Sequence, residues 1–291
     1  MKIFWAFNPF DKDKKLRNTG KSILNAFFKK EDQVQAIYVA SNAEVNVATA
    51  YHLPKEKRYT DYPRKLIKKD LTDLGIKKIG IEVIPSLSFS LSSTVKLFAA
   101  FAKNNNADLI LVATNARSLI PRMVFGSFAE SLVHLSMSDL LIYHQKTKVG
   151  LNPPRKILYA HDFSTKGNLG LLRITEYAKK WNSTLIIVHI VRPDFNLENG
   201  QGKLSNSYRQ DVLNQVKKIE ESLKKQEINV AIYLEASLES ASSVILKIAK
   251  NTKSDIVALT AKSGNLTALL GGSITRQVLR ESTLLTLVLK V

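Results

Sequence analysis

The sequence contains no cysteine and few glycines and prolines, and each shortage excludes a class of protein. Because cysteine is absent, the chain has no disulfide framework, no thiolate metal site and no catalytic thiol. With 12 glycines and 8 prolines in 291 residues, it is neither a collagen-like nor a low-complexity chain. Hydrophobic residues make up 45% of the sequence, which is typical of a folded globular protein.

Long hydrophobic runs are missing as well. The longest, such as 108–113 and 284–289, are interrupted within about eight residues, whereas a helix that spans a bilayer needs about 20. The apolar start of the chain reaches only Asn8 and Pro9, and it lacks an apolar signal region followed by a small-residue cleavage site. We therefore expect a soluble, cytoplasmic protein with no membrane partner.

Acidic residues are outnumbered by basic ones, 25 against 43, which gives a net charge of +18. This excess suggests a nucleic-acid partner, but it is spread along the chain. Residues 1–150 carry 23 basic and 13 acidic residues, net +10, and the remainder carries +8. Because a nucleic-acid footprint concentrates charge on one face, we favour a solvated basic surface. A nucleic-acid-associated protein is the less favoured alternative.

The hydrophobic pattern alternates between strand-like and helix-like segments. In the first half we expect strands at 2–7, 34–39, 78–84, 108–113 and 139–144, and helices at 14–30, 61–74, 92–102 and 128–135. In the second half we expect strands at 156–161, 184–190, 230–234, 255–260 and 284–289, and helices at 169–181, 208–225, 242–250 and 274–280, with a polar loop through Gly200 and Gly202.

A polar segment separates the two halves. It contains Gly150 and ends in Pro153 and Pro154, which neither a helix nor a central strand tolerates. We therefore predict a first domain over 1–147, a linker over 148–154 and a second domain over 155–291. Alternating strands and helices predict, for each domain, an α/β fold with an open five-stranded parallel sheet and helices on both faces.

The two halves also match each other in sequence, which indicates an internal duplication. Residues 2–8 (KIFWAFN) align with 156–162 (KILYAHD), and 126–128 (GSF) aligns with 272–274 (GSI).

The candidate ligand residues follow the strands of the second half, because ligands of open parallel sheets bind beyond the carboxyl ends of the strands. These are Asp162, Ile190 and the segment 259–273. Gly272 and Ser273 open the last helix, where free N–H groups can hold a phosphate. In the alternative interpretation, Asp162, Ser164 and Ser273 merely cap helices. Spacing alone leaves both interpretations open.

Three segments of the second half resemble the universal stress protein family. They are 156–164 (KILYAHDFS), like its opening strand; 185–190, like a second strand that usually ends in His-Val and here ends in His189 and Ile190; and 271–279 (GGSITRQVL) with 284–289, like its closing helix and strand. The similarity extends to both halves, so the chain resembles a tandem member. The resemblance implies Rossmann-like, adenine nucleotide alpha hydrolase-like domains and a stress-response role, and many members bind ATP or another adenine nucleotide.

The nucleotide motif of the family is Gly, two residues, Gly, nine residues, then Gly and Ser or Thr. The second half keeps the spacing with Leu259, Lys262, Gly272 and Ser273, of which the last two match. The resemblance implies that Asp162 meets the adenine, that Ile190 contacts the base, and that Gly272 and Ser273, followed by Ile274, hold phosphate. A leucine opposes close backbone approach, whereas Lys262 supplies a point charge for phosphate. The cofactor implied is ATP or AMP.

The first half departs further from this motif. It has Ala113 and Ala116 in place of the glycines, and Asn8 in place of Asp162. We expect no tight nucleotide binding there. Single-domain members of the family commonly dimerise through their last strands, so the resemblance implies that 139–144 and 284–289 pair within this chain as an intramolecular pseudo-dimer. Further dimerisation of whole chains stays open.

No pattern of enzymatic chemistry is found. The five histidines lack metal-ligand spacing, no Gly-x-Ser-x-Gly elbow occurs, and residues 19–22 (TGKS) match only the end of a P-loop. His161 and His189 close strands and are expected to be satisfied core or site-edge histidines. We therefore expect a regulatory binding protein with weak ATPase activity at most. The alternative is a protein-interaction module that binds no nucleotide.

Overall fold

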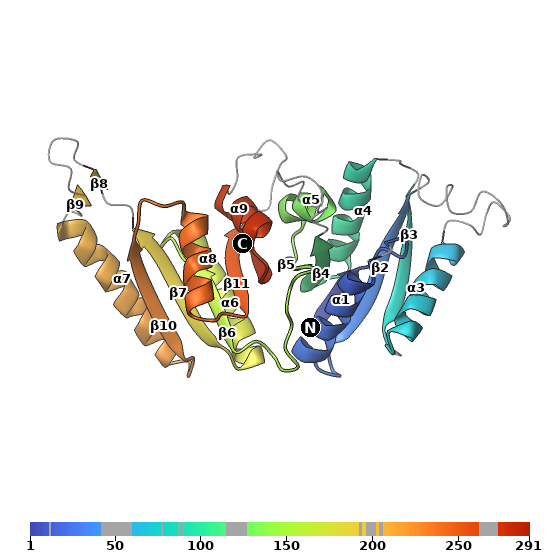
Figure 1. The fold of residues 1–291 in the computed structure, drawn as a ribbon, viewed down its shortest axis with the longest axis horizontal. Helices are drawn as coiled ribbons and strands as arrows, with labels where there is room; N and C mark the ends of the chain where they lie inside the picture. Colours follow the sequence, from blue (N-terminus) through green and yellow to red (C-terminus); the bar gives the residue numbers. More distant parts are fainter. Residues whose placement is uncertain are drawn as a thin grey trace. The chain divides into compact units, whose positions relative to one another are not determined.

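The computed structural model describes residues 1–11, 13–41, 60–76, 78–86, 88, 90–114, 127–191, 194–195, 202–203, 206–261 and 273–291. The chain divides into two compact units (Figure 1). The first unit contains Met1–Asn152 and the last strand of the sequence within Thr283–Lys290. The second contains Pro153–Thr260 and the last helix within Gly272–Ser282.

The first unit has the expected alternation of strands and helices. Its strands are β1 (Lys2–Ala6), β2 (Gln33–Ser41), β3 (Gly80–Ser86), β4 (Leu109–Thr114) and β5 (Asp139–His144). Its helices are α1 (Lys14–Phe27), α3 (Asp61–Asp73), α4 (Leu91–Asn104) and α5 (Ser127–Leu135). The strands pair in parallel in the order β3-β2-β1-β4-β5, which confirms the predicted α/β class.

The last strand of the sequence, β12 (Leu285–Lys290), pairs antiparallel with β5. This confirms the pairing that the family resemblance implied for these two segments. Lys290 fixes the end of β12, because its backbone N–H donates to Asp139 Oδ1 at 2.8 Å and its Nζ donates to the carbonyl of Val133. Burial lowers the pKa of Lys290 to about 8.

The second unit repeats the alternation of strands and helices around a sheet of four parallel strands. Its strands are β6 (Lys156–Ala160), β7 (Thr184–Val191), β10 (Val230–Ala236) and β11 (Ile256–Ala261), and its helices are α6 (Thr165–Trp181), α7 (Asn206–Lys224), α8 (Ala241–Asn251) and α9 (Ser273–Glu281). These strands are parallel in the order β10-β7-β6-β11. Figure 1 shows α6 and α8 beside this sheet.

Two local predictions in the second unit were wrong. A hairpin of two-residue strands, β8 (Asp194–Phe195) and β9 (Gly202–Lys203), replaces part of the predicted polar loop, because two residues are too few to show an alternating pattern. Helix α6 begins at Thr165 instead of 169, because Ser164 caps it and accepts a hydrogen bond from the Gly167 N–H at 3.0 Å.

Side chains of β1 show that helices cover both faces of the first sheet. Phe4 lies 5.6 Å from Phe101 of α4, whereas the adjacent Trp5 packs against Gly20 of α1. Successive strand residues point to opposite faces, so α1 and α4 lie on opposite sides of β1. A Cβ at Gly20 would lie 2.5 Å from the Trp5 ring. Gly20 is therefore a packing residue, consistent with rejecting a P-loop at 19–22.

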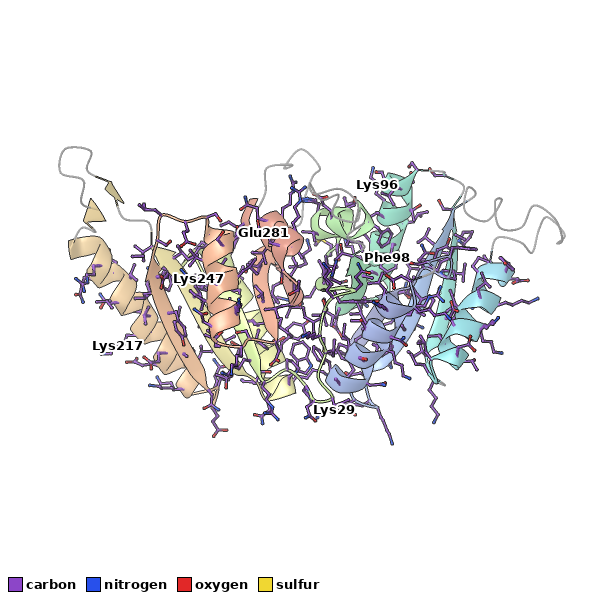
Figure 2. All side chains as sticks on the ribbon, in the orientation of Figure 1. Lys29, Lys96, Phe98, Lys217, Lys247 and Glu281 are labelled. Carbon is purple, nitrogen blue, oxygen red and sulfur yellow. The ribbon has the colours of Figure 1, made fainter. Side chains whose placement is uncertain are left out.

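Exposed basic side chains occur on both units. Lys29 and Lys96 of the first unit, and Lys217 and Lys247 of the second, are exposed (Figure 2). Within the part of the chain that the structure describes, no helix is long and apolar enough to cross a membrane.

Candidate functional site

Asp162 stands at the carboxyl end of β6, held in place by the next turn. Its Oδ1 accepts hydrogen bonds from the N–H of Ser164 at 3.0 Å and from the Ser164 hydroxyl at 2.6 Å. Burial alone would raise the pKa of Asp162, but these hydrogen bonds and the neighbouring His161 hold it below its usual value. The residue is nevertheless exposed. It therefore presents a fixed, ionised carboxylate at the surface.

The turn after β6 allows this arrangement because of two backbone positions. Phe163 has a left-handed backbone with φ of 57°, which turns the chain directly after Asp162. Gly167 lies in the first turn of α6, and a Cβ there would lie 2.5 Å from Asp162 Oδ1. Glycine at 167 thus leaves room for the carboxylate over the start of the helix. The capping interpretation is confirmed for Ser164, and Asp162 braces that cap.

Two buried histidines lie beneath this turn. The Nδ1 of His161 accepts from the N–H of Phe163 at 3.0 Å, and the Nδ1 of His189 donates to the carbonyl of His161 at 2.9 Å. The Phe163 ring contacts both, at centroid distances of 5.0 and 4.2 Å. Burial lowers the pKa of His161, which favours its neutral form. The two histidines are core residues, as expected.

Each histidine makes its hydrogen bond through Nδ1. The Nε2 atoms of both are buried and have no hydrogen-bond partner among the described residues. Among all residues that the structure describes, no group of three or more His, Cys, Asp or Glu side chains could hold a metal ion.

A cavity of about 350 Å³ lies in the first unit, at the carboxyl ends of β1, β2 and β4. Six aromatic side chains line it: Trp5, Phe7, Tyr38, Phe98, Phe128 and Tyr143. The cavity was not predicted from the sequence. The available signal was the pair of small residues, Ala6 and Ala113, that end β1 and precede the end of β4.

A sequence model of the universal stress protein family matches residues 30–144 and 154–290. The chain belongs to the universal stress protein family. The two matches cover most of both halves, in agreement with the tandem arrangement predicted from the sequence. A search of curated protein sequences gives no significant match.

Solved universal stress protein structures share the fold along the whole chain. A universal stress protein from Archaeoglobus fulgidus DSM 4304 is 16% identical, with a TM-score of 0.67 over 99% of this chain and 98% of its own. A putative universal stress protein from Pseudomonas aeruginosa UCBPP-PA14 is 13% identical, with a TM-score of 0.65 over 99% and 92%. A universal stress protein solved in complex with cAMP is 17% identical and covers 48% of this chain, with a TM-score of 0.35.

The structure brings three of the predicted residues of this universal stress protein to one sheet edge. The register pairs Ala160 of β6 with Val188 of β7, and Tyr159 with Ala258 of β11. Measured along the paired strands, the positions of Asp162, Ile190 and Leu259 therefore differ by no more than two residues. Ile190 is partly exposed, whereas Leu259 is only 3% exposed.

The remaining predicted residues concern the last helix and the segment before it. Helix α9 begins at Ser273, and Ile274 in its first turn is 39% exposed. Lys262 and Gly272 lie outside the described residues.

Proposed function

We propose that this universal stress protein is a stress-response regulatory protein that binds an adenine nucleotide, ATP or AMP, in its second unit. The site is the carboxyl edge of β6, β7 and β11 together with the start of α9. The observation that carries the proposal is the exposed Asp162 carboxylate, which is ionised and fixed by Ser164.

The chemistry of this edge suits an adenine nucleotide. A fixed carboxylate accepts hydrogen bonds from the amino group of adenine or from a ribose hydroxyl, and a charged acceptor makes stronger hydrogen bonds than a neutral one. Ile190 offers an apolar contact for the base. The N-terminus of α9 at Ser273 supplies free N–H groups and a positive dipole end for phosphate. Hydrolysis is not part of the proposed role.

The corresponding edge of the first unit lacks the charged acceptor. Asn8 stands where the second unit has Asp162, and its Oδ1 accepts from the N–H of Phe10 at 2.9 Å. An uncharged amide occupied in this way is a weaker partner for a ligand. The proposal therefore places one nucleotide site in the chain.

The test is isothermal titration of the full chain with ATP and with AMP. We expect wild type to release or absorb heat, and Asp162→Ala to bind at least about tenfold more weakly, equivalent to about 1.4 kcal/mol. The matched control is Asn8→Ala, the same position in the first repeat, which should bind like wild type. An absence of binding heat at millimolar nucleotide would overturn the proposal.

A second candidate function is docking of a protein partner, and one surface favours it. Strand β10 is an outer strand of its sheet, and it exposes Tyr233 and Leu234 at 41% and 39%, with Leu238 beyond it at 69%. Exposed apolar residues on a sheet edge are typical of interaction sites. A stoichiometric partner that is retained by wild type and lost in Leu234→Lys, in a protein that binds no nucleotide, would favour this function.

A further inference from the structure

The cavity of the first unit has a lining that differs in kind from the proposed nucleotide site. We propose that it binds a small, uncharged aromatic molecule. This binding activity is separate from the proposed function, since it lies in the other unit and involves none of the same residues.

The walls of the cavity are aromatic and held in place by one another. Trp5 and Phe7 meet edge to face at 4.8 Å, and Phe98 and Phe128 do so at 5.6 Å. The Trp5 Nε1–H donates to the Tyr143 hydroxyl at 3.0 Å. Rings fixed in edge-to-face pairs present faces and edges that favour another aromatic ring. The walls are therefore organised before a ligand arrives.

Both terminal nitrogens of the one cationic side chain among the described lining residues are engaged within the protein, which disfavours a phosphate as the main ligand group. Arg17 pairs through Nη1 with Asp70 Oδ1 at 2.7 Å, and its Nη2 donates to the carbonyls of Pro9 and Asp11. Its guanidinium also lies 5.6 Å from the Phe7 ring centre, and only its buried Nε has no hydrogen-bond partner among the described residues. An anion would thus lose its hydration without gaining a free cation.

Two further polar groups of the wall are paired within the protein. The Thr94 hydroxyl donates to the carbonyl of Ser90 at 3.2 Å, and the Trp5 N–H donates to the Tyr143 hydroxyl. A cavity with a largely aromatic wall and with these polar groups paired favours apolar contents over ordered water. Its volume of about 350 Å³ is within the usual range for ligand pockets, roughly 300–1,000 Å³, and suits one or two aromatic rings.

The strand registers show how the two repeats differ at this cavity. Trp5 of β1 pairs with Leu111 of β4, and the corresponding Tyr159 of β6 pairs with Ala258 of β11, so Ala113 occupies the position of Thr260. The Thr260 hydroxyl is hydrogen-bonded to the Tyr159 hydroxyl at 2.7 Å, whereas Ala113 lines the cavity. The replacement Ala113→Leu places a larger side chain in the cavity and should close part of it.

The test uses N-phenyl-1-naphthylamine, an uncharged two-ring fluorescent probe, with the full chain. The sequence has two tryptophans, so a Trp181→Phe background leaves Trp5, in the cavity wall, as the reporter. We expect probe fluorescence to rise on binding, with energy transfer from Trp5. Ala113→Leu should weaken binding at least tenfold. The matched control Ala160→Leu, at the position of the second repeat that corresponds to Ala6, should change it less than twofold.

Circular dichroism and unfolding midpoints of Ala113→Leu and Ala160→Leu establish whether these variants are folded. If Ala113→Leu does not fold, Ala6→Leu serves as the cavity-filling variant in its place. Equal probe affinity in wild type and in a folded cavity-filling variant would overturn the proposal. Displacement of the probe by millimolar ATP that persists in Asp162→Ala would also overturn it, because the cavity would then take a charged nucleotide. A failure of ATP to bind anywhere leaves this prediction unchanged and affects only the proposed function.

Discussion

At the scale of single residues, the second repeat depends on a glycine that faces two hydroxyl groups. A Cβ at Gly170 of α6 would lie 2.3 Å from both the Thr260 Oγ1 and the Tyr159 hydroxyl. These two oxygens are hydrogen-bonded to each other at 2.7 Å, and the Tyr159 hydroxyl also donates to the carbonyl of Gly167. Helix α6 therefore packs closely on β6 and β11 because residue 170 has no side chain.

We predict that Gly170→Ala destabilises the protein by about 1–3 kcal/mol through overpacking, although alanine favours a helix by about 1 kcal/mol. Urea unfolding measures the difference. The control is Gly150→Ala, whose Cβ would come no closer than 4.0 Å to another heavy atom. Adding Tyr159→Phe to Gly170→Ala removes one of the two opposing oxygens and should recover part of the loss. An unchanged or raised midpoint for Gly170→Ala would contradict this description of the packing.

Some residues of the site were predictable from sequence and others were not. Asp162 and Ser164 were identified because they directly follow a strand, and strand ends can be seen in the sequence. The pairing of Arg17 with Asp70 and the contact of Phe163 with His189 were not, because each joins segments whose proximity depends on strand order. The cavity in the first unit was missed for the same reason.

At the scale of elements, periodicity predicted the long strands and helices because each buries one face or stripe. The sequence predicted α1 to reach residue 30, but it ends at Phe27, since the C-cap residue Phe28 has an extended backbone. Elements of two residues, such as β8 and β9, carry no periodic signal. Helix starts depend on the capping side chain, as the start of α6 at Ser164 demonstrates.

The pairing of β12 with β5 contains a titratable group that we expect to affect stability. Lys290 is 6% exposed, and burial lowers its pKa from 10.5 to about 8 in the folded protein. Between these values the unfolded chain holds a proton that the folded chain has released. Stability therefore rises with pH across this window, by up to about 1.4 kcal/mol per pH unit for this group.

Lys290→Met removes this contribution. We predict that the free energy of unfolding of wild type increases relative to Lys290→Met as the pH rises from 8 toward 10. Urea titrations at several pH values measure the difference between the two proteins, so the other titrating groups cancel to first order. If the free energies of unfolding of the two proteins changed in parallel with pH, the lowered pKa of the buried Lys290 would be contradicted.

At the scale of the whole molecule, the net charge of +18 has a physical consequence that requires no ligand. Like charges repel more strongly in the compact state than in the unfolded chain, and salt screens this repulsion. We predict that the unfolding temperature rises as sodium chloride is increased from about 20 mM to about 300 mM, which shortens the Debye length from roughly 20 Å to roughly 6 Å. Differential scanning fluorimetry measures it. A fall in the midpoint would mean that specific ion pairs dominate over net repulsion.

The duplication is the feature of the whole molecule that the sequence predicted best. Corresponding aromatic residues, Trp5 and Tyr159, pack on glycines of the first helix of each unit, Gly20 and Gly170. The two copies nevertheless differ at positions near the carboxyl ends of their strands: Asn8 corresponds to Asp162, and Ala113 to Thr260. We interpret the protein as a duplicated fold whose two copies differ in the residues proposed to contact a ligand.

We propose that only the second copy binds an adenine nucleotide. The most direct measurement is the number of ATP molecules bound per chain, by equilibrium dialysis of the 291-residue chain at saturating ATP. We predict one ATP per chain in wild type and in Asn8→Ala, and weaker binding in Asp162→Ala. Two ATP molecules per chain, or one that is unaffected by Asp162→Ala and lost in Ala113→Leu, would contradict it.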